Sequence, residues 1–250
     1  TTGIAVKAMT QAPELPGVRA IVFDEVHERQ LDMDLVLMWA KHLRATSRPD
    51  LKIIAMSATL DAGPIADWLG AALIRSDGRS YPVETTYQPP ATGRAAPLPL
   101  GSQVANALRS LPKDDPGDVL VFLPGVREIE HVRTTLESDP SLPTLVITPL
   151  YAQLGHSGVQ AALRERAHRQ VILATNIAES SITLAKVRTV IDSGLARVPR
   201  ANPWTGLLHL DTSEIGRDSA VQRMGRAGRT APGRCIRLFS EADFRSRAHS

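Results

Sequence analysis

Two adjacent carboxylates, Asp24 and Glu25, directly follow the short apolar run Ala20–Phe23, which predicts a buried strand. Mg²⁺ prefers hard oxygen ligands, so Asp24 could hold the ion through water, and Glu25 could orient or deprotonate an attacking water. The same carboxylates could instead begin a helix, because acidic side chains favour its N-terminal end. The preceding strand favours a nucleotide–metal site.

Two groups of small polar residues also follow apolar runs. Ser57 and Thr59 come after one run, and Thr175 and Asn176 come after another. Hydroxyl groups and backbone amides in such places can bind the phosphates of a nucleic-acid strand without reading its bases. Taken alone, the first group is more typical of a Ser/Thr turn or helix cap, and the second is a weak signal.

The most specific string is 222–229, which reads Gln-Arg-Met-Gly-Arg-Ala-Gly-Arg. Arg226 and Arg229 are three residues apart, so on a helix they would share a face and could bind one polyanion. A basic helix lying on nucleic acid or in solvent is the alternative. Glycine inside a helix costs about 1 kcal/mol, however, which indicates a packing or functional reason. Small residues would leave room for the polyanion: Gly225, Ala227 and Gly228.

Alternating strands and helices must position these groups. A strand at 20–23, a helix and a strand at 52–56 predict a βαβ unit with a buried parallel sheet. We expect that helix to pack through Leu31, Leu35, Met38, Trp39 and Leu43. Asp61 could cap a further helix running to Trp68, and both Trp39 and Trp68 fit core positions.

A proline-rich stretch at 76–101 is the expected domain boundary, and a second series of elements follows it. The expected strands are 119–123, 144–148, 171–174, 187–191 and 235–239, the helices are 126–137, 158–167 and 217–226, and a hairpin joins 195–199 to 207–210. The fold class is therefore α/β, with two parallel-sheet units in tandem.

Composition sets limits on the class of protein. The 250 residues are 43% hydrophobic, which supports a packed core, and the net charge of +3 permits a nucleic-acid partner. The single cysteine, Cys235, excludes a disulfide framework and a cysteine-cluster zinc site, and is expected to be a buried small side chain. No apolar run approaches the roughly 20 residues that span a membrane. We expect a cytoplasmic protein without membrane contact.

In their order along the chain, these strings resemble the DEAH/RHA group of superfamily-two ATP-dependent helicases. The resemblance covers essentially the whole sequence, and residues 192–197 favour one bacterial subgroup. The matching strings are Asp-Glu-Val-His-Glu-Arg at 24–29, Ser-Ala-Thr at 57–59, and the segments 79–84, 121–125, 149–151, 174–181, 192–194 and 222–229.

The resemblance implies two RecA-like (P-loop NTPase type) domains in tandem, the first one incomplete. Residues 1–78 would be the C-terminal part of the first, ATP-binding domain, and 79–250 the second, helicase C-terminal domain. ATP and Mg²⁺ would bind between them, and the enzyme would translocate on single-stranded RNA or DNA. The hairpin at 195–210 resembles the family's strand-separating hairpin. Trp204 at its tip could stack on a base or pack against the adjoining domain, and we favour packing.

The resemblance also assigns roles around the nucleotide. Asp24 would hold Mg²⁺ through water, and Glu25 would act as the base for the attacking water. His27 would contact Gln222 across the cleft.

Further roles follow from the same resemblance. Arg226 and Arg229 would be arginine fingers on the γ-phosphate, and Asp192 would lie near the nucleotide. The nucleic-acid and coupling residues would be Gly3, Ser57, Thr59, Thr175 and Asn176.

Three departures from the family pattern matter. The sequence holds no G-x-x-x-x-G-K-[ST] phosphate loop, so we expect a fragment that begins after it and lacks the C-terminal domains. Thr2 stands where the family has an acid, and Leu163 stands where relatives often carry a stacking aromatic. The alternative is a non-enzymatic nucleic-acid-binding module that kept the fold, and the upstream sequence would distinguish the two.

Overall fold

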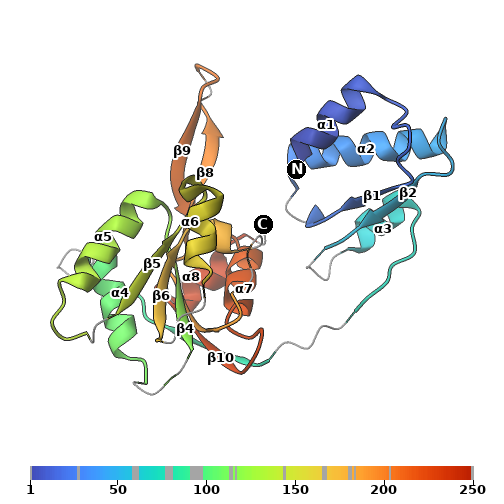
Figure 1. The fold of residues 1–250 in the computed structure, drawn as a ribbon. Helices are drawn as coiled ribbons and strands as arrows, with labels where there is room; N and C mark the ends of the chain where they lie inside the picture. The colour runs from blue at the N-terminus through green and yellow to red at the C-terminus, as the bar shows by residue number, and fades with distance from the viewer. Residues whose placement is uncertain are drawn as a thin grey trace. The chain divides into compact units, whose positions relative to one another are not determined.

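The computed structural model forms two compact units, Thr1–Asp77 and Gly78–Ser250, which we call unit 1 and unit 2 (Figure 1). It describes the chain except for residues 1, 27–28, 58–61, 77–80, 91–97, 113–114, 116, 143–144, 165–167, 180–181, 183, 203 and 249–250, and the side chains of His156 and Ala161. None of the helices in this described part is long and apolar enough to cross a bilayer.

Unit 1 contains the parallel βαβ arrangement that the sequence predicts, but the expected burial of its sheet is wrong: Val22 of the first strand is 55% exposed and Ile54 of the second is 48% exposed. Strands β1 (Ala20–Phe23) and β2 (Lys52–Ala55) pair in parallel, and α2 (Leu31–Ala45) connects them. Helix α1 (Thr2–Gln11) precedes β1, and α3 (Gly63–Leu69) follows β2. The expected cap Asp61 lies outside the described residues.

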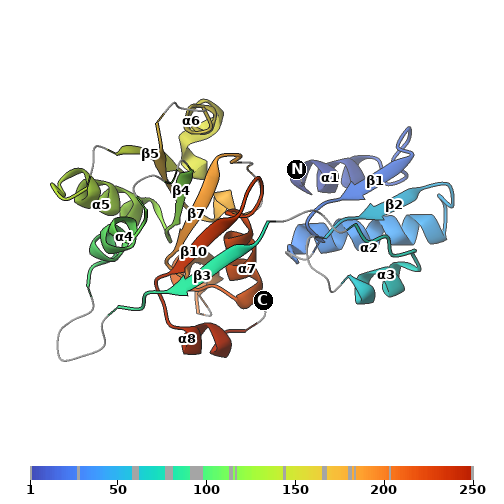
Figure 2. The same cartoon turned by 90° about the horizontal axis from the view of Figure 1, so that it is seen from below.

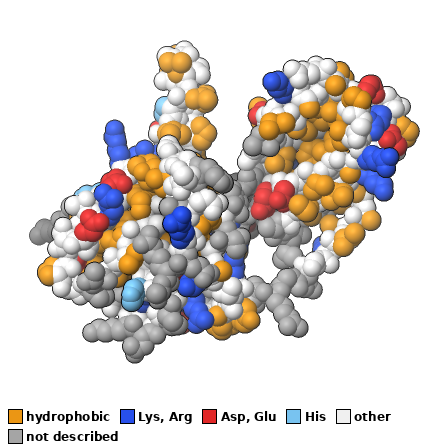
Figure 3. Space-filling model, viewed as in Figure 1, with side chains coloured by type: hydrophobic (Ala, Val, Ile, Leu, Met, Phe, Trp, Pro, Cys, Tyr) orange, Lys and Arg blue, Asp and Glu red, His pale blue; other side chains and the backbone are white. Residues whose placement is uncertain are grey.

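Helix α2 packs through a different face from the one predicted. Its buried residues are Val36, Leu37, Ala40 and Leu43, so only Leu43 of the predicted stripe is buried. Leu31, Leu35, Met38 and Trp39 are exposed, and Trp68 of α3 is 43% exposed. The helix is apolar on two faces, and periodicity alone does not tell which one meets the sheet. Figure 3 shows hydrophobic side chains across the visible face of unit 1.

Unit 2 is built on a six-stranded, all-parallel sheet with the order β3-β10-β7-β4-β6-β5. Every residue of β4 is buried, because helices cover both faces of the sheet. The strands are β3 (Val83–Tyr87), β4 (Asp118–Phe122), β5 (Val146–Leu150), β6 (Gln170–Ala174), β7 (Val187–Asp192) and β10 (Gly233–Arg237).

The side-chain alternation of β4 divides the core of unit 2 in two. Val119 and Val121 pack toward one helical layer, and Leu120 and Phe122 pack toward the other. Helices α4 (Leu100–Arg109) and α5 (Val126–Glu137) form the first layer, and α6 (Gly155–Ala162) and α7 (Arg217–Gly225) lie on the opposite face (Figure 2). The short helix α8 (Glu241–Ser246) ends the unit.

A two-stranded antiparallel hairpin, β8 (Leu195–Ala201) with β9 (Leu208–Glu214), projects from the sheet of unit 2 (Figure 1). Leu208 and Leu210 pair across from Ala201 and Pro199, so one face of its outer half is apolar. Both leucines are exposed, and Trp204 at the tip is 93% exposed, so it does not pack within unit 2.

Several elements differ from those predicted. The predicted strand at 144–148 lies two residues later, as β5 (Val146–Leu150), and the helix predicted at 158–167 begins earlier, as α6 (Gly155–Ala162). Among the α-helices and strands of the described residues, four had no predicted counterpart: α1, β3, α4 and α8. Cys235 is buried as expected, and burial raises the pKa of its thiol to about 12.

Candidate functional site

The paired carboxylates lie at the carboxyl end of β1, beside the end of β2. The backbone amide of Met56 donates to the carbonyl of Phe23 at 2.7 Å, and the amide of Val26 donates to the carbonyl of Met56 at 3.1 Å. These two hydrogen bonds bring the Asp24–Glu25 loop next to Ser57, which follows β2. The structure therefore brings together three of the predicted residues of unit 1.

Glu25 holds an unusual backbone conformation. Its φ is 54°, in the left-handed region that side-chain-bearing residues rarely adopt. The amide of Glu25 donates to Asp24 Oδ1 at 3.0 Å, and this contact fixes the local turn. Strain of this kind costs about 1–3 kcal/mol and is common where a functional group must be held in one place.

The donor set at this loop fits Mg²⁺. Asp24 is exposed and offers one hard carboxylate, and Mg²⁺ commonly keeps several waters while binding one or two carboxylates. Within the described part of the chain, no group of three or more His, Cys, Asp or Glu side chains could hold a metal ion.

The polar residues of unit 2 gather at the carboxyl edge of its sheet. Thr175 and Asn176 follow β6, and Asp192 ends β7, with β4 between these two strands. The amide of Thr175 donates to the carbonyl of Leu150 at 3.2 Å, which ties the loop after β6 to the end of β5. Thr175 is partly exposed and Asn176 is exposed, so both are open to a ligand.

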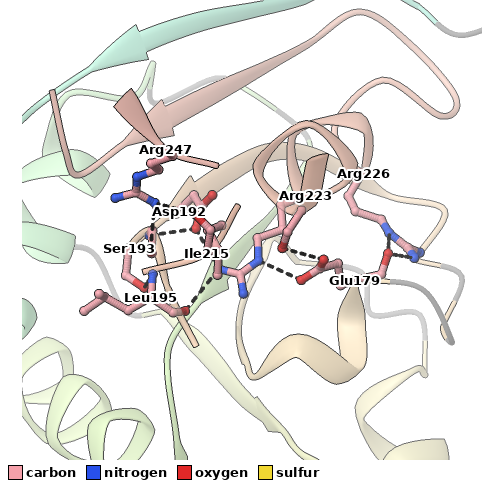
Figure 4. Close-up of polar contacts among 10 residues, drawn as sticks. Glu179, Asp192, Ser193, Leu195, Ile215, Arg223, Arg226 and Arg247 are labelled. Carbon is pink, nitrogen blue, oxygen red and sulfur yellow. Dashed lines mark hydrogen bonds and ion pairs between the residues drawn. The ribbon is translucent and has the colours of Figure 1, made fainter. Parts of the chain in front are cut away.

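Asp192 faces the interior of unit 2 and is fully buried. Its Oδ1 accepts hydrogen bonds from the amide of Gly194 at 2.9 Å and from Nη1 of Arg223 at 2.9 Å (Figure 4). In this conformation the carboxylate is closed off from solvent, so any effect on a nucleotide passes through its neighbours.

Arg223 and Glu179 are central residues that the sequence analysis missed. Arg223 is 1% exposed, and its guanidinium forms ion pairs with Glu179 at 3.0 Å and Asp192 at 2.9 Å. Burial alone would lower the pKa of Arg223, but the Asp192 and Glu179 carboxylates raise it above its ordinary value. One signal was available: Arg223 lies three residues after the small residue Ala220, on the same side of α7, and that side is buried.

The predicted shared helical face of Arg226 and Arg229 is wrong. Helix α7 ends at Gly225, because the chain turns there, so both arginines lie beyond its last residue. Arg226 is 3% exposed, and its Nε donates to the carbonyl of Glu179 at 2.9 Å. Arg229 is exposed. The two guanidiniums therefore differ sharply in their access to a ligand.

The missing side chain of Gly228 makes room for the backbone of Tyr81 rather than for a polyanion. The amide of Tyr81 donates to the carbonyl of Gly228 at 2.9 Å, and a Cβ added at Gly228 would lie 2.6 Å from the Tyr81 carbonyl oxygen. The glycine thus allows the segment before β3 to pass close by. Ala227 is buried in the core, whereas a Cβ at Gly225 would meet no atom within 4 Å.

The remaining predicted residues are placed as follows. Gln222 is partly exposed on α7, and Gly3 is exposed in the first turn of α1. His27 and Thr59 lie outside the described residues. Gly3, Asp24, Glu25 and Ser57 belong to unit 1, and the other described site residues belong to unit 2.

A cavity of about 530 Å³ lies at the opposite, amino-terminal edge of the unit 2 sheet. It contains none of the predicted site residues. The lining residues are Pro82, Glu84, Pro112, Asp115, Arg188, Pro232, Gly233 and Arg234.

The chain belongs to the helicase conserved C-terminal domain family, whose model matches residues 103–231. The six-stranded sheet of unit 2 is the RecA-like domain of that family. The chain is 39% identical over 245 residues to the ATP-dependent RNA helicase HrpB of Escherichia coli strain K12, covering 96% of this chain and 30% of that protein. It is 38% identical over 249 residues to HrpA of the same strain, covering 99% of this chain and 19% of that protein.

A human relative and a solved structure are similar to the chain over nearly its whole length. The probable ATP-dependent RNA helicase DHX34 of Homo sapiens is 35% identical over 260 residues, covering 98% of this chain and 22% of that protein. A crystal structure of the E. coli DEAH/RHA helicase HrpB matches with a TM-score of 0.87 and 36% identity, covering 98% of this chain and 31% of that one. The resemblance to the DEAH/RHA group is confirmed. The chain spans 19–30% of the length of these curated relatives.

Proposed function

We propose that the protein carrying this chain is an ATP-dependent RNA or DNA helicase. It would hydrolyse ATP between two RecA-like domains and use the energy to translocate on a single strand in the cytoplasm. Residues 1–78 would form the C-terminal part of the first domain, and residues 79–250 would form the second domain.

One observation carries the proposal. In both units, several of the residues predicted to act lie at the carboxyl ends of parallel strands, which is where α/β sheets bind ligands. Asp24 and Ser57 follow neighbouring strands in unit 1, and Thr175 and Asp192 mark strand ends in unit 2. The relatives, named as ATP-dependent RNA helicases, support the same assignment.

The roles of the nucleotide site follow from its chemistry. Mg²⁺, when bound, neutralises charge on the transferring phosphate, and Asp24 would hold it through water. Glu25, held in place by its turn, would take the proton of the attacking water. Arg229 would reach the phosphates from its exposed position, and Arg226 would have to leave the Glu179 carbonyl to join it.

His27, Gln222 and the nucleic-acid residues complete the proposal. His27 would contact Gln222 when the domains close. Ser57 and Thr59 would couple the ATP site to the nucleic-acid channel, and Thr175 with Asn176 would hold the phosphates of the strand, with Gly3 on the other domain. The isolated 250 residues are expected to hydrolyse little ATP, because no phosphate loop occurs in their sequence.

The substitution Glu25→Gln in the full-length protein tests the proposal. It removes the base and keeps the size of the side chain, so we expect kcat for ATP hydrolysis to fall about 10²–10⁴-fold while ATP affinity changes little. Steady-state ATPase rates and binding of a fluorescent ATP analogue measure the two effects. Glu14→Gln is the matched control, because Glu14 is an exposed carboxylate of the same unit outside the loop. Undiminished turnover in Glu25→Gln would remove Glu25 from its role.

A further inference from the structure

Arg223 joins four separate segments of unit 2. From α7, its Nε donates to Glu179 Oε2 at 3.0 Å, and its Nη1 donates to Asp192 Oδ1 at 2.9 Å. The same Nη1 donates to the carbonyl of Leu195 at 3.2 Å (Figure 4). The guanidinium also lies 4.7 Å from the ring centre of Phe122. One buried cation therefore contacts the ends of β4 and β7, the loop after β6 and the first residue of the hairpin.

The Glu179 end of this network belongs to the proposed nucleic-acid loop. Glu179 lies at the end of the short 3-10 turn Asn176–Ala178, in the same loop after β6 as Thr175 and Asn176. Its Oε1 accepts from Ser219 Oγ at 2.5 Å, so α7 holds it at a second point. Its carbonyl accepts from Arg226 Nε at 2.9 Å. Movement of this loop would therefore displace its hydrogen-bond partners on α7 and the side chain of Arg226.

The Leu195 end belongs to the hairpin. Leu195 begins β8, which pairs with β9, and the exposed Leu208 and Leu210 lie on β9 in the outer half of the hairpin. Apolar contact at the root is small, with Ala196, Ile215 and Ala220 as its buried members. Arg247 holds the root from the other side by donating to the carbonyls of Gly194 at 2.9 Å and Ile215 at 3.3 Å. Polar contacts therefore determine the direction in which the hairpin projects.

A buried charge network of this kind is weak evidence for stability, since apolar residues of similar volume often serve as well. Its value lies in geometry, because the planar fork of arginine fixes several acceptors at once and a lysine ammonium does not. We propose that Arg223 is a positioning residue that couples ATP hydrolysis to strand separation by locking the root of the hairpin to α7 and to the loop after β6. This inference rests on the proposed helicase function.

The test is Arg223→Lys in the full-length protein, measured as base pairs unwound per ATP hydrolysed. Lysine keeps a positive charge near Asp192 and Glu179 but cannot span both of them and the Leu195 carbonyl. We expect single-strand-stimulated ATP turnover within a few-fold of wild type, and unwinding per ATP reduced about tenfold. A purely structural role would lower both activities together.

Arg247→Lys is the matched control. Arg247 is also buried at the hairpin root, but it donates hydrogen bonds to Gly194, Ile215 and Asp243 rather than to the loop after β6. We expect unwinding per ATP to stay near wild type in this variant. An equal loss in Arg247→Lys would overturn the proposal, because it would show that any loosening of the hairpin has the same effect.

A second variant keeps the inference testable if Arg223→Lys does not fold. Glu179→Gln keeps the shape of the side chain and removes the charge that Arg223 pairs with, so unwinding per ATP should fall in the same direction. Unchanged coupling in Glu179→Gln, or in a folded Arg223→Lys, overturns the inference. A wild-type protein that neither hydrolyses ATP nor unwinds a duplex would instead contradict the proposed function itself.

Discussion

At the scale of single residues, the most demanding position is Glu25. In its proposed role Glu25 would face one water molecule, and such a carboxylate would gain from a rigid backbone, which here holds a left-handed φ of 54°. The hydrogen bonds between Phe23, Met56 and Val26 hold this turn on either side. The arrangement trades stability for placement of the carboxylate, as strained functional residues often do.

Glycine adopts a positive φ without strain, so Glu25→Gly should relieve the local conformation. Glu25→Gln also removes the carboxylate but keeps the strain, and the pair therefore isolates the backbone effect. We expect the glycine variant to have a free energy of unfolding about 1 kcal/mol higher than the glutamine variant. Urea unfolding of both proteins, followed by circular dichroism, measures the difference. A glycine variant that is the less stable of the two would contradict the strain argument.

The sequence predicted where the carboxylates lie but not how they are held. The apolar run before Asp24 placed both residues at a strand end, and the structure confirms that position. The left-handed turn could not be predicted, since nothing about glutamate favours it. The burial of Arg223 and Arg226 was also hidden, because arginine is mostly exposed in proteins and only the fold supplies the buried acceptors.

At the scale of elements, helix packing depends on where small residues lie. Gly101 of α4 faces Thr135 of α5, and a Cβ added at Gly101 would lie 2.5 Å from Thr135 Oγ1. The hydroxyl of Thr135 donates to the carbonyl of His131 at 2.9 Å, which holds its side chain in place. The two helices can approach this closely only because residue 101 has no side chain.

Gly101→Ala should therefore destabilise unit 2, although alanine favours helices. We expect the free energy of unfolding to fall by about 1–3 kcal/mol through overpacking. The double variant with Thr135→Ala should recover part of the loss, because it removes Oγ1 and Cγ2 but keeps the Cβ that lies 2.9 Å from the added carbon. Gly225→Ala is the control, because a Cβ there meets no atom within 4 Å. Thermal and urea unfolding compare the four proteins, and a fully stable Gly101→Ala would show that the helices simply move apart.

Elements with one clear pattern were predicted well, and ambiguous ones were not. Helix α5 was predicted with both of its ends, since its apolar spacing has one solution and a buried strand precedes it. The packing face of α2 was wrong because that helix has two apolar faces. Strand β3 was missed because its sequence, Val-Glu-Thr-Thr-Tyr, is not an apolar run. Polar residues lie between Val83 and Tyr87 and a proline precedes them, as suits a strand at the edge of a sheet.

At the scale of the whole molecule, β3 decides where unit 2 begins. This strand lies inside the proline-rich stretch at 76–101, yet it pairs with β10 along its full length, from Val83 opposite Gly233 to Tyr87 opposite Arg237. Arg237 is 3% exposed and donates to the hydroxyl of Tyr87 at 2.9 Å. Its guanidinium also lies 3.9 Å from the ring centre of Phe244. The edge strand thus covers a buried cation.

Two truncations follow from this arrangement. Residues 78–250 should fold with the same urea midpoint that unit 2 shows within the whole chain. Residues 88–250, which lack β3, should lose more than about 3 kcal/mol, because Arg237 loses a buried partner and β10 loses a neighbour. Circular dichroism during urea unfolding measures both proteins. Equal stability of the two fragments would show that β3 is dispensable.

The hairpin also has a consequence for how the protein behaves in concentrated solution. Its outer half offers an apolar face, and Figure 3 shows orange side chains along it. Contacts between apolar ribbons are not weakened by ionic screening, and sulfate or phosphate salts strengthen them. Crowded preparations should therefore self-associate through Leu208, Leu210 and Trp204, and crystals grown from such salts would tend to place one molecule's ribbon against another's.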